Sequence, residues 1–325
     1  MSTVFLFPGQ GAQFPGMVKD ICDAHPEAMR LVKEAEEISG EALSEWLWNS
    51  DASLLSRSDR SQLAITVASL AIAKVLEIKG IKADAVAGFS LGEYPALYTS
   101  GVLSFADTIR VVKERGRIMQ EACEAIQNES SSSELDNASP GMAAVIGLET
   151  EEIIAILKEY SGEKGIVFPV NMNSPKQTVV AGTAEGLEVC ERLCKEKGAR
   201  RFIRLQVAGP FHSPLMHKAA KDFGNFLETI SFQNPKTLFF SNVTGDIIKS
   251  GEEAKRRAVE HITYPVLWTS VEKKIHAFFE ESKSKAVLLE VGPGKVLSGL
   301  WRDSGYAEAI TSIPCGTLEQ IQSII

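Results

Sequence analysis

The distribution of apolar residues predicts alternating strands and helices in the first part of the chain. Val4–Phe7 is a short, uniformly apolar run of the kind that forms a buried strand. Residues 62–78 are apolar nearly all round, which predicts a central buried helix ended by Gly80. A second strand is expected at residues 85–87 and a helix from residue 93 to about residue 100. Strands that alternate with helices are typical of a parallel sheet covered by helices on both faces.

A different order of elements follows in the middle of the chain. "GMAAVIGL" predicts a strand, "ETEEIIAILKEY" an amphipathic helix, "IVFPVNM" and "QTVVAG" two strands, "AEGLEVCERLCKEKG" a helix and "RFIRLQV" a last strand. The order βαββαβ is that of ferredoxin-like folds. We therefore expect a ferredoxin-like subdomain at residues 138–207, inserted into a large α/β domain made of residues 1–137 and 208–325.

Two further stretches complete the predicted organisation. Strands near residues 237–242 and at residues 286–291 return the chain to the large domain. Residues 128–141, "NESSSSELDNASPG", are polar and rich in serine, so we expect an exposed, mobile loop there.

Composition and charge narrow the class of protein. The 325 residues carry a net charge of −8, which gives no reason to expect nucleic acid as a partner. The start of the chain lacks the basic region and long apolar run of a signal peptide, and we expect no membrane span, so the prediction is a cytoplasmic protein. The five cysteines fit no disulfide framework. Cys190 and Cys194 have no further Cys or His at metal-ligand spacing, so no metal site is expected.

Residues 88–92, "GFSLG", fit the pattern G-x-S-x-G. In this pattern a serine lies on a tight turn between a strand and a helix, and side chains at the glycine positions would clash with neighbouring backbone. The turn exposes the hydroxyl above the sheet, and the helix N-terminus offers backbone N–H groups to an oxyanion. An apolar strand precedes Ser90 and a predicted helix follows it, so we favour a nucleophile over a chance match.

A serine nucleophile needs a base, and His212 is the best of the five histidines. It follows a predicted strand and precedes a helix opened by Ser213-Pro214, and sheet enzymes place catalytic residues in such strand-end loops. The alternative is a histidine that merely caps or packs at a helix start. No acidic residue is evident in a matching loop. A backbone carbonyl can also hold the imidazole tautomer, so a Ser–His dyad is possible.

Arg115 is the one basic residue turned inward on the predicted helix at residues 104–122. It lies about 60° from the centre of the apolar face, by the rule of 100° per residue. A partly buried guanidinium needs an anion. That anion is either an internal Asp or Glu or a substrate carboxylate gripped by both arms of the guanidinium.

Eight motifs, in order along nearly the whole chain, resemble the malonyl-CoA:acyl carrier protein transacylase family, which includes the acyltransferase domains of fatty acid and polyketide synthases. They are "FPGQGAQ" (7–13), "GFSLGEY" (88–94), "RGRIMQEA" (115–122), "NMNSPKQ" (171–177), "FHSPLM" (211–216), "SNVTG" (241–245), "YPVLWT" (264–269) and "EVGPGKVLSGL" (290–300). The resemblance implies an α/β hydrolase-like large domain that contains the parallel sheet, together with the ferredoxin-like insert.

The resemblance also implies roles for individual residues. Ser90 corresponds to the acyl-accepting nucleophile and His212 to its base. Gln10 and the backbone N–H of Leu91 correspond to the oxyanion hole. Arg115 matches the arginine that pairs with the malonyl carboxylate.

Further positions bear on substrate choice and on the histidine. Asn173 falls in a motif near the active-site cleft, and Phe211 resembles the malonyl-selecting variant, because a bulky ring there should crowd an α-methyl group. Leu267 is expected to orient His212 through its main-chain carbonyl. Phe89 stands where the family usually has histidine, and Leu267 where many members have glutamine or asparagine; the effect of both departures on acyl selectivity is left open.

The reaction implied by the resemblance is ping-pong transfer of malonyl from malonyl-CoA to the phosphopantetheine thiol of an acyl carrier protein, without a metal or redox cofactor. The sequence leaves open whether that carrier serves fatty acid or polyketide synthesis, and also the oligomeric state. Two other enzymes share the serine and histidine, an acyl-thioester hydrolase and a trans-acting polyketide acyltransferase. A non-catalytic interaction module is a further alternative.

Overall fold

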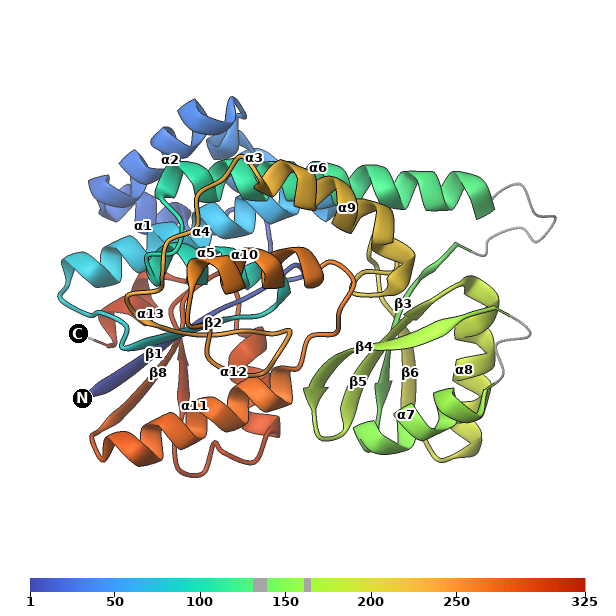
Figure 1. Cartoon of the computed structure of the whole chain (residues 1–325). Helices are drawn as coiled ribbons and strands as arrows, with labels where there is room; N and C mark the ends of the chain where they lie inside the picture. The colour runs from blue at the N-terminus through green and yellow to red at the C-terminus, as the bar shows by residue number, and fades with distance from the viewer. Residues whose placement is uncertain (131–138, 161–164, 325) are drawn as a thin grey trace.

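The computed structural model describes residues 1–130, 139–160 and 165–324. Its strands form a five-stranded sheet of order β7-β2-β1-β8-β9 and a four-stranded sheet of order β4-β5-β3-β6, which lie side by side (Figure 1). The strands are β1 Ser2–Phe7, β2 Ala85–Gly88, β3 Gly141–Ile146, β4 Val167–Ser174, β5 Gln177–Gly182, β6 Arg201–Arg204, β7 Leu238–Phe240, β8 Ala286–Glu290 and β9 Ser312–Pro314.

The helices in the described residues cover both sheets. They are α1 Lys19–Ala24, α2 Pro26–Ser39, α3 Leu43–Asn49, α4 Ser58–Ile78, α5 Glu93–Thr99, α6 Phe105–Ser130, α7 Thr150–Glu159, α8 Ala184–Glu196, α9 His217–Leu227, α10 Gly251–Glu260, α11 Trp268–Ser282, α12 Val296–Asp303 and α13 Leu318–Gln322, with short 3-10 turns η1 Leu54–Ser56, η2 Ser90–Gly92 and η3 Pro214–Met216.

All neighbouring strands of the five-stranded sheet are parallel, as the alternation of strands and helices predicts. Alternate residues of β1 enter opposite cores. Phe5 and Phe7 join the cluster that α2, α4 and α6 cover, whereas Val4 and Leu6 join the cluster that α11 and α12 cover (Figure 1). A strand buried on both faces explains why β1 is apolar at every position from Val4 to Phe7.

Helix α4 is the central buried helix that the sequence predicts. It is the one helix in the described part of the chain that is long and apolar enough to cross a membrane, and 83 % of that apolar stretch is buried inside the protein. Its apolar surface is therefore accounted for by the core, in which it packs against α2 and α6.

The four-stranded sheet is antiparallel and has the ferredoxin-like strand order that βαββαβ implies. Helices α7 and α8 bury their apolar faces against it. Its strand β4 also connects to the large part of the molecule, because the N–H of Met172 donates to the carbonyl of Val266 at 2.9 Å and the N–H of Val266 donates to Val170 at 2.8 Å. Backbone hydrogen bonds thus join the smaller sheet to the segment that enters α11.

The predicted serine-rich loop is wrong at its start. Helix α6 continues through residues 128–130, where the sequence analysis places a loop, because the polar residues there still permit helical backbone. Residues 131–138 of the predicted loop lie outside the described residues.

Candidate active site

The turn that carries Ser90 has the strained geometry of G-x-S-x-G. It joins β2 to α5, and the φ of Ser90 is 51°, in the left-handed region that non-glycine residues rarely adopt. A Cβ at Gly88 would collide with the backbone of Gly92, and a Cβ at Gly92 would collide with the carbonyl of Phe7. Both glycines are therefore needed to hold the turn against β1, and the Ser90 side chain remains partly exposed.

Asn242 fixes this turn from a distant part of the chain. Its Oδ1 accepts the backbone N–H of Ser90 at 2.7 Å, and its Nδ2 donates to the carbonyl of Gly88. Asn242 is fully buried shortly after β7, the strand that pairs with β2. One side chain therefore satisfies both peptide groups that the strained turn leaves without strand partners.

His212 lies within hydrogen-bond distance of Ser90. The Nε2 of His212 is 2.7 Å from the Oγ of Ser90, and its Nδ1 is 2.7 Å from the carbonyl oxygen of His261. A carbonyl only accepts, so Nδ1 carries the proton and Nε2 is left to accept the hydroxyl of Ser90. His212 also has a left-handed φ of 59°, so both members of the pair sit on strained backbone.

Burial keeps His212 in the form that a base needs. The side chain is 4 % exposed. Burial in the first place, and the neighbouring His261 and Arg115 in the second, hold the pKa of His212 well below its ordinary value of 6.5, although backbone carbonyls partly oppose them. The imidazole is therefore neutral at pH 7 and can take a proton.

The prediction that the main-chain carbonyl of Leu267 orients the histidine is wrong. The carbonyl bonded to His212 Nδ1 belongs to His261. Leu267 is the N-cap of α11, and its own carbonyl accepts the N–H groups of Ser270 and Val271, each at 3.1 Å. The first turn of the helix thus takes up the oxygen that the sequence analysis assigned to the histidine.

No carboxylate bonds to His212 among the described residues, but a buried one lies close by. Glu93 is 4 % exposed at the start of α5, and its Oε2 is 3.0 Å from the Nδ1 of His261. Its Oε1 accepts the backbone N–H of Asn242. The ring of His261 in turn lies 4.8 Å from that of His212.

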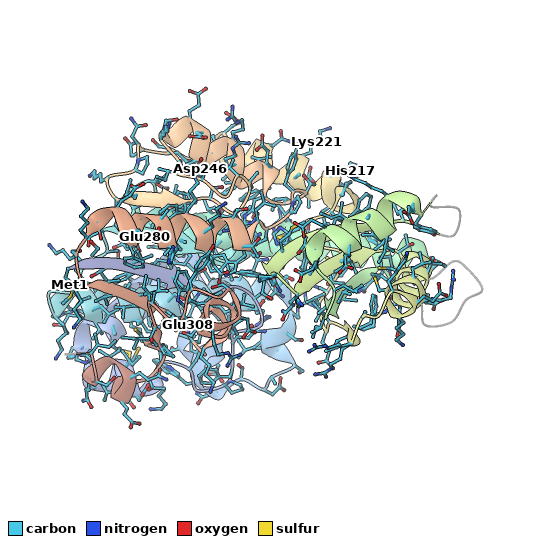
Figure 2. All side chains as sticks on the ribbon, turned by 90° about the horizontal axis from the view of Figure 1, so that it is seen from below. Met1, His217, Lys221, Asp246, Glu280 and Glu308 are labelled. Carbon is cyan, nitrogen blue, oxygen red and sulfur yellow. The ribbon has the colours of Figure 1, made fainter. Side chains whose placement is uncertain are left out.

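The sequence did not predict a role for His261, Glu93 or Asn242 in the site. His261 had a detectable signal, since it lies ten residues after Gly251 and seven after Ala254, on the face of α10 that is buried. Asn242 lies in the quoted motif "SNVTG" without an assigned role, and nothing in the local pattern marks Glu93 as buried. Among the histidines other than His212 and His261, His217 is exposed on the surface of α9 (Figure 2).

Arg115 is buried and has no carboxylate partner among the described residues. Its side chain is 2 % exposed, and one guanidinium nitrogen donates to Gln62 Oε1 at 2.6 Å. The other terminal nitrogen and Nε have no hydrogen-bond partner in the described part of the chain. The guanidinium lies 5.2 Å above the ring of Tyr94. Of the two anions expected for Arg115, the internal Asp or Glu is therefore not found within residues 1–130, 139–160 and 165–324.

The two residues predicted to form the oxyanion hole are Gln10 and Leu91. A Cβ at Gly9 would collide with the carbonyl of Phe89, so the loop that carries Gln10 lies against the serine turn. Gln10 is partly exposed, and its amide is 3.4 Å from the Ser58 hydroxyl. Leu91 is buried directly after Ser90.

Asn173 and Phe211 are also buried. Asn173 is 7 % exposed in β4, and its Oδ1 has no partner among the described residues. Phe211 is 6 % exposed and directly precedes His212. The ring of Phe89 packs edge-on against Trp268, with ring centroids 5.3 Å apart.

The closing motif at residues 290–300 packs at the carboxyl ends of β8 and β1. Glu290 accepts the N–H groups of Leu297 at 2.9 Å and Ser298 at 2.7 Å, which caps α12. A Cβ at Gly292 would collide with Pro8, at the start of the loop that carries Gln10. Within residues 1–130, 139–160 and 165–324, no three His, Cys, Asp or Glu side chains are grouped to hold a metal ion.

Comparison with known proteins places this arrangement in a family. Residues 4–309 match the family model described as an acyl transferase domain. The chain is 37 % identical over 302 residues to the malonyl CoA-acyl carrier protein transacylase of Bacillus subtilis, covering 91 % of this chain and 88 % of that protein. It is 37 % identical to the transacylase of the same name from Escherichia coli K12, covering 91 % and 90 %.

Solved structures agree with these relatives. A malonyl-transacylase in complex with a type II PKS acyl-carrier protein superposes with a TM-score of 0.88 at 33 % identity, over 99 % of this chain and 98 % of that one. The malonyl CoA-acyl carrier protein transacylase of Coxiella burnetii superposes with a TM-score of 0.89 at 29 % identity, over 100 % and 97 %.

Proposed function

The chain belongs to the acyl transferase family that contains the malonyl CoA-acyl carrier protein transacylases, and on that premise we propose that it transfers malonyl from malonyl-CoA to the phosphopantetheine thiol of an acyl carrier protein. The observation that carries the choice of acyl group is Arg115. Its guanidinium is buried, lacks a carboxylate partner among the described residues, and its positive charge contributes to the low pKa of His212. A free carboxylate on the acyl group would supply the missing anion.

In the first half of the reaction, Ser90 is the nucleophile and His212 the general base. The Nε2 of His212 takes the hydroxyl proton while Oγ forms a bond to the thioester carbonyl carbon. When the tetrahedral intermediate collapses, the carbon–sulfur bond breaks and the coenzyme A thiolate takes the proton from His212. The product of this half is a malonyl ester of Ser90.

Charge on the carbonyl oxygen needs donors in place before the reaction. We assign this role to the Gln10 side-chain amide and to the backbone N–H of Leu91, which lies in the η2 turn at the start of α5. The loop of Gln10 is held against the serine turn by the contact of Gly9 with Phe89, which supports this assignment.

Arg115 is assigned to the malonyl carboxylate. Its guanidinium has donors left over after its bond to Gln62, and Gln62 fixes its orientation from α4. We assign Asn173, whose buried Oδ1 has no partner among the described residues, to the small-sheet side of the same site, and Phe211, the residue before His212, to limiting space beside the base. A branched acyl group would meet the Phe211 ring.

In the second half, the carrier thiol replaces coenzyme A. Its proton passes to His212 Nε2, its sulfur attacks the ester carbonyl, and the Ser90 alkoxide leaves and regains the proton from His212. No proton or electron is consumed overall. Water must be kept from the ester, since its attack would release free malonate.

The division of the chain into residues 1–137 with 208–325 and the inserted residues 138–207 is retained as a proposal. It is supported by the two separate sheets and by the buried cluster between β3, β5, α7 and α8. A cytoplasmic location is also proposed. All five cysteines are free thiols and buried, which suits a reducing compartment.

One experiment tests the function. The purified protein is incubated with malonyl-CoA and a holo acyl carrier protein, and malonyl-carrier, free malonate and coenzyme A are quantified. We expect malonyl-carrier to account for most of the coenzyme A released. Free malonate as the main product would indicate a hydrolase, and no coenzyme A release would indicate an interaction module. Carriers from fatty acid and polyketide systems, compared in parallel, identify the pathway.

A further inference from the structure

His261 contacts the proposed base in two ways. Its carbonyl oxygen accepts the Nδ1 proton of His212 at 2.7 Å, and its imidazole lies against the His212 ring, with centroids 4.8 Å apart and planes tilted by 36°. The first contact is made by the backbone and survives any substitution at this position. The second is made by the side chain and requires a ring.

A carboxylate faces the His261 imidazole. The side chain is fully buried, and its Nδ1 is 3.0 Å from Glu93 Oε2, although neither ring nitrogen makes a hydrogen bond of good geometry within the described residues. No other ion pair of Glu93 is found in the described residues, although the side chain is only 4 % exposed. A carboxylate removed from water needs a cation or several hydrogen bonds, so His261 and Glu93 form a unit that can hold a proton.

The charged and titratable groups around His261 and Glu93 come from several elements. Glu93 approaches His261 from α5, and His212 approaches it from the loop before η3. Arg115 on α6 acts on His212 from another direction. On His261's own helix, Arg257 and Glu260 pair with each other at 2.6 Å. Thus Glu93 is the carboxylate that faces His261, whereas His212 has a carbonyl and a hydroxyl but no carboxylate within hydrogen-bond distance among the described residues.

From this geometry we propose that the His261 side chain buffers the base: facing Glu93, its imidazole takes the first proton that enters the histidine pair as pH falls and thereby keeps His212 neutral. The proposal rests on the roles proposed for Ser90 and His212. Two imidazoles 4.8 Å apart in a buried site cannot both become charged without repulsion, so their titrations are coupled. The proton goes to the ring that has a carboxylate to neutralise it. The charge on His261 then opposes protonation of His212.

The consequence is a pH range of activity wider on its acid side than His212 alone would allow. With His261 present, the base stays unprotonated and can accept the Ser90 proton at lower pH. An isolated imidazole of the same burial would already begin to be protonated at those pH values. Replacement of the ring by an uncharged side chain should therefore move the acid limb of the rate profile to higher pH, while the rate on the plateau changes little.

The test uses His261→Gln, which retains the backbone carbonyl and leaves an amide to donate to Glu93. The rate at which a fluorophosphonate inactivates Ser90 is measured from pH 5 to 8.5, because this reaction needs the base but not malonyl-CoA. We expect a loss of roughly three- to tenfold at the acid end, equivalent to a shift of roughly half to one pH unit, and a change within about twofold at pH 8. His276→Gln is the matched control, since His276 also faces a carboxylate, Glu280 at 3.6 Å, but stacks on Tyr306 instead of His212.

Two results would overturn the proposal. An equal fractional loss at every pH would mean that the ring serves packing alone, and an unmoved acid limb would mean that it carries no charge that His212 feels. If the variant does not fold, NMR titration of the imidazole nitrogens in the unmodified protein decides the matter. We expect His261 to take its proton before His212, and the reverse order would refute the mechanism. Absent malonyl transfer with normal fluorophosphonate behaviour would refute the proposed function and leave this inference standing.

Discussion

Asn242 bonds to the backbone N–H of Ser90 across 152 positions of sequence, at 2.7 Å from its Oδ1. The same side chain bonds the carbonyl of Gly88, so it holds both sides of a turn whose central residue has a φ of 51°. Strain of this kind persists only where the surrounding structure determines it. The position of the Ser90 hydroxyl is therefore set by a residue that takes no part in bond making.

Asn242→Ala should lower both stability and activity. The substitution leaves a buried N–H and a buried carbonyl without partners, which should lower the free energy of unfolding by about 1–3 kcal/mol. Displacement of Ser90 should lower the acylation rate by roughly tenfold or more. Chemical denaturation and single-turnover acylation measure the two effects. Asn234→Ala removes a comparable bond to the N–H of Gly251 away from the site and should leave the acylation rate unchanged.

Ser90→Ala should abolish covalent labelling by malonyl-CoA while the fold is retained, because the ester can form only on the Ser90 oxygen. Intact-protein mass spectrometry detects the added malonyl group, and circular dichroism checks the fold. Labelling that persists in the variant would refute the assignment of the nucleophile.

His212→Ala should lower the acylation rate by at least roughly a hundredfold, the usual contribution of a general base. In the unmodified protein, the low pKa of His212 should keep acylation near its plateau at pH 6.5, the ordinary midpoint of histidine, with the loss occurring at lower pH. His217→Ala, on the surface of α9, is the control and should behave as the unmodified protein does.

Arg115→Ala should separate malonyl from acetyl transfer. Loss of a buried charge pair should cost malonyl transfer about 2–5 kcal/mol in transition-state free energy, whereas acetyl transfer should hold steady or rise. Lysine at this position should restore activity only in part, because it lacks the planar fork. The values of kcat/KM for both acyl-CoAs measure the difference. Arg117→Ala on the same helix, 48 % exposed and paired with Glu114, should alter neither; equal losses of both activities in Arg115→Ala would make that arginine structural.

Glu272→Gln should stabilise the protein at neutral pH. Burial raises the pKa of Glu272 from 4.5 to about 8, although Trp268 donates a hydrogen bond to it at 2.9 Å. Because the folded value lies above the unfolded one, the carboxyl group costs stability as pH rises from 4.5, and the cost levels off near pH 8. The gain in the variant should be on the order of 2–3 kcal/mol at pH 7 and vanish near pH 4.5, as thermal melts at both pH values would reveal. Glu280→Gln, 70 % exposed on the same helix, is the control.

Local patterns in the sequence determined much of the fold. The uniformly apolar run in β1 and the apolar α4 predict two-sided burial, and the order βαββαβ predicts the smaller sheet, because periodicity records which face of an element is covered. Gly88, Ser90 and Gly92 predict the turn, since the pattern of small residues around the serine is itself local. Arg115 is likewise placed inward by its angle on α6, and it is 2 % exposed.

Only the tertiary structure decided which groups meet. Periodicity states that a side chain is buried but not what it touches, so whether Arg115 meets an internal carboxylate depended on the packing of α4 against α6, which places Gln62 beside it. The carbonyl that orients His212 was misassigned to Leu267 for the same reason. The partner is His261, at the end of a helix whose sequence is mostly charged, and its imidazole reaches the site because the buried face of α10 ends there. Contacts between residues far apart in the chain follow from the docking of whole elements, and no local pattern of hydrophobicity encodes that docking.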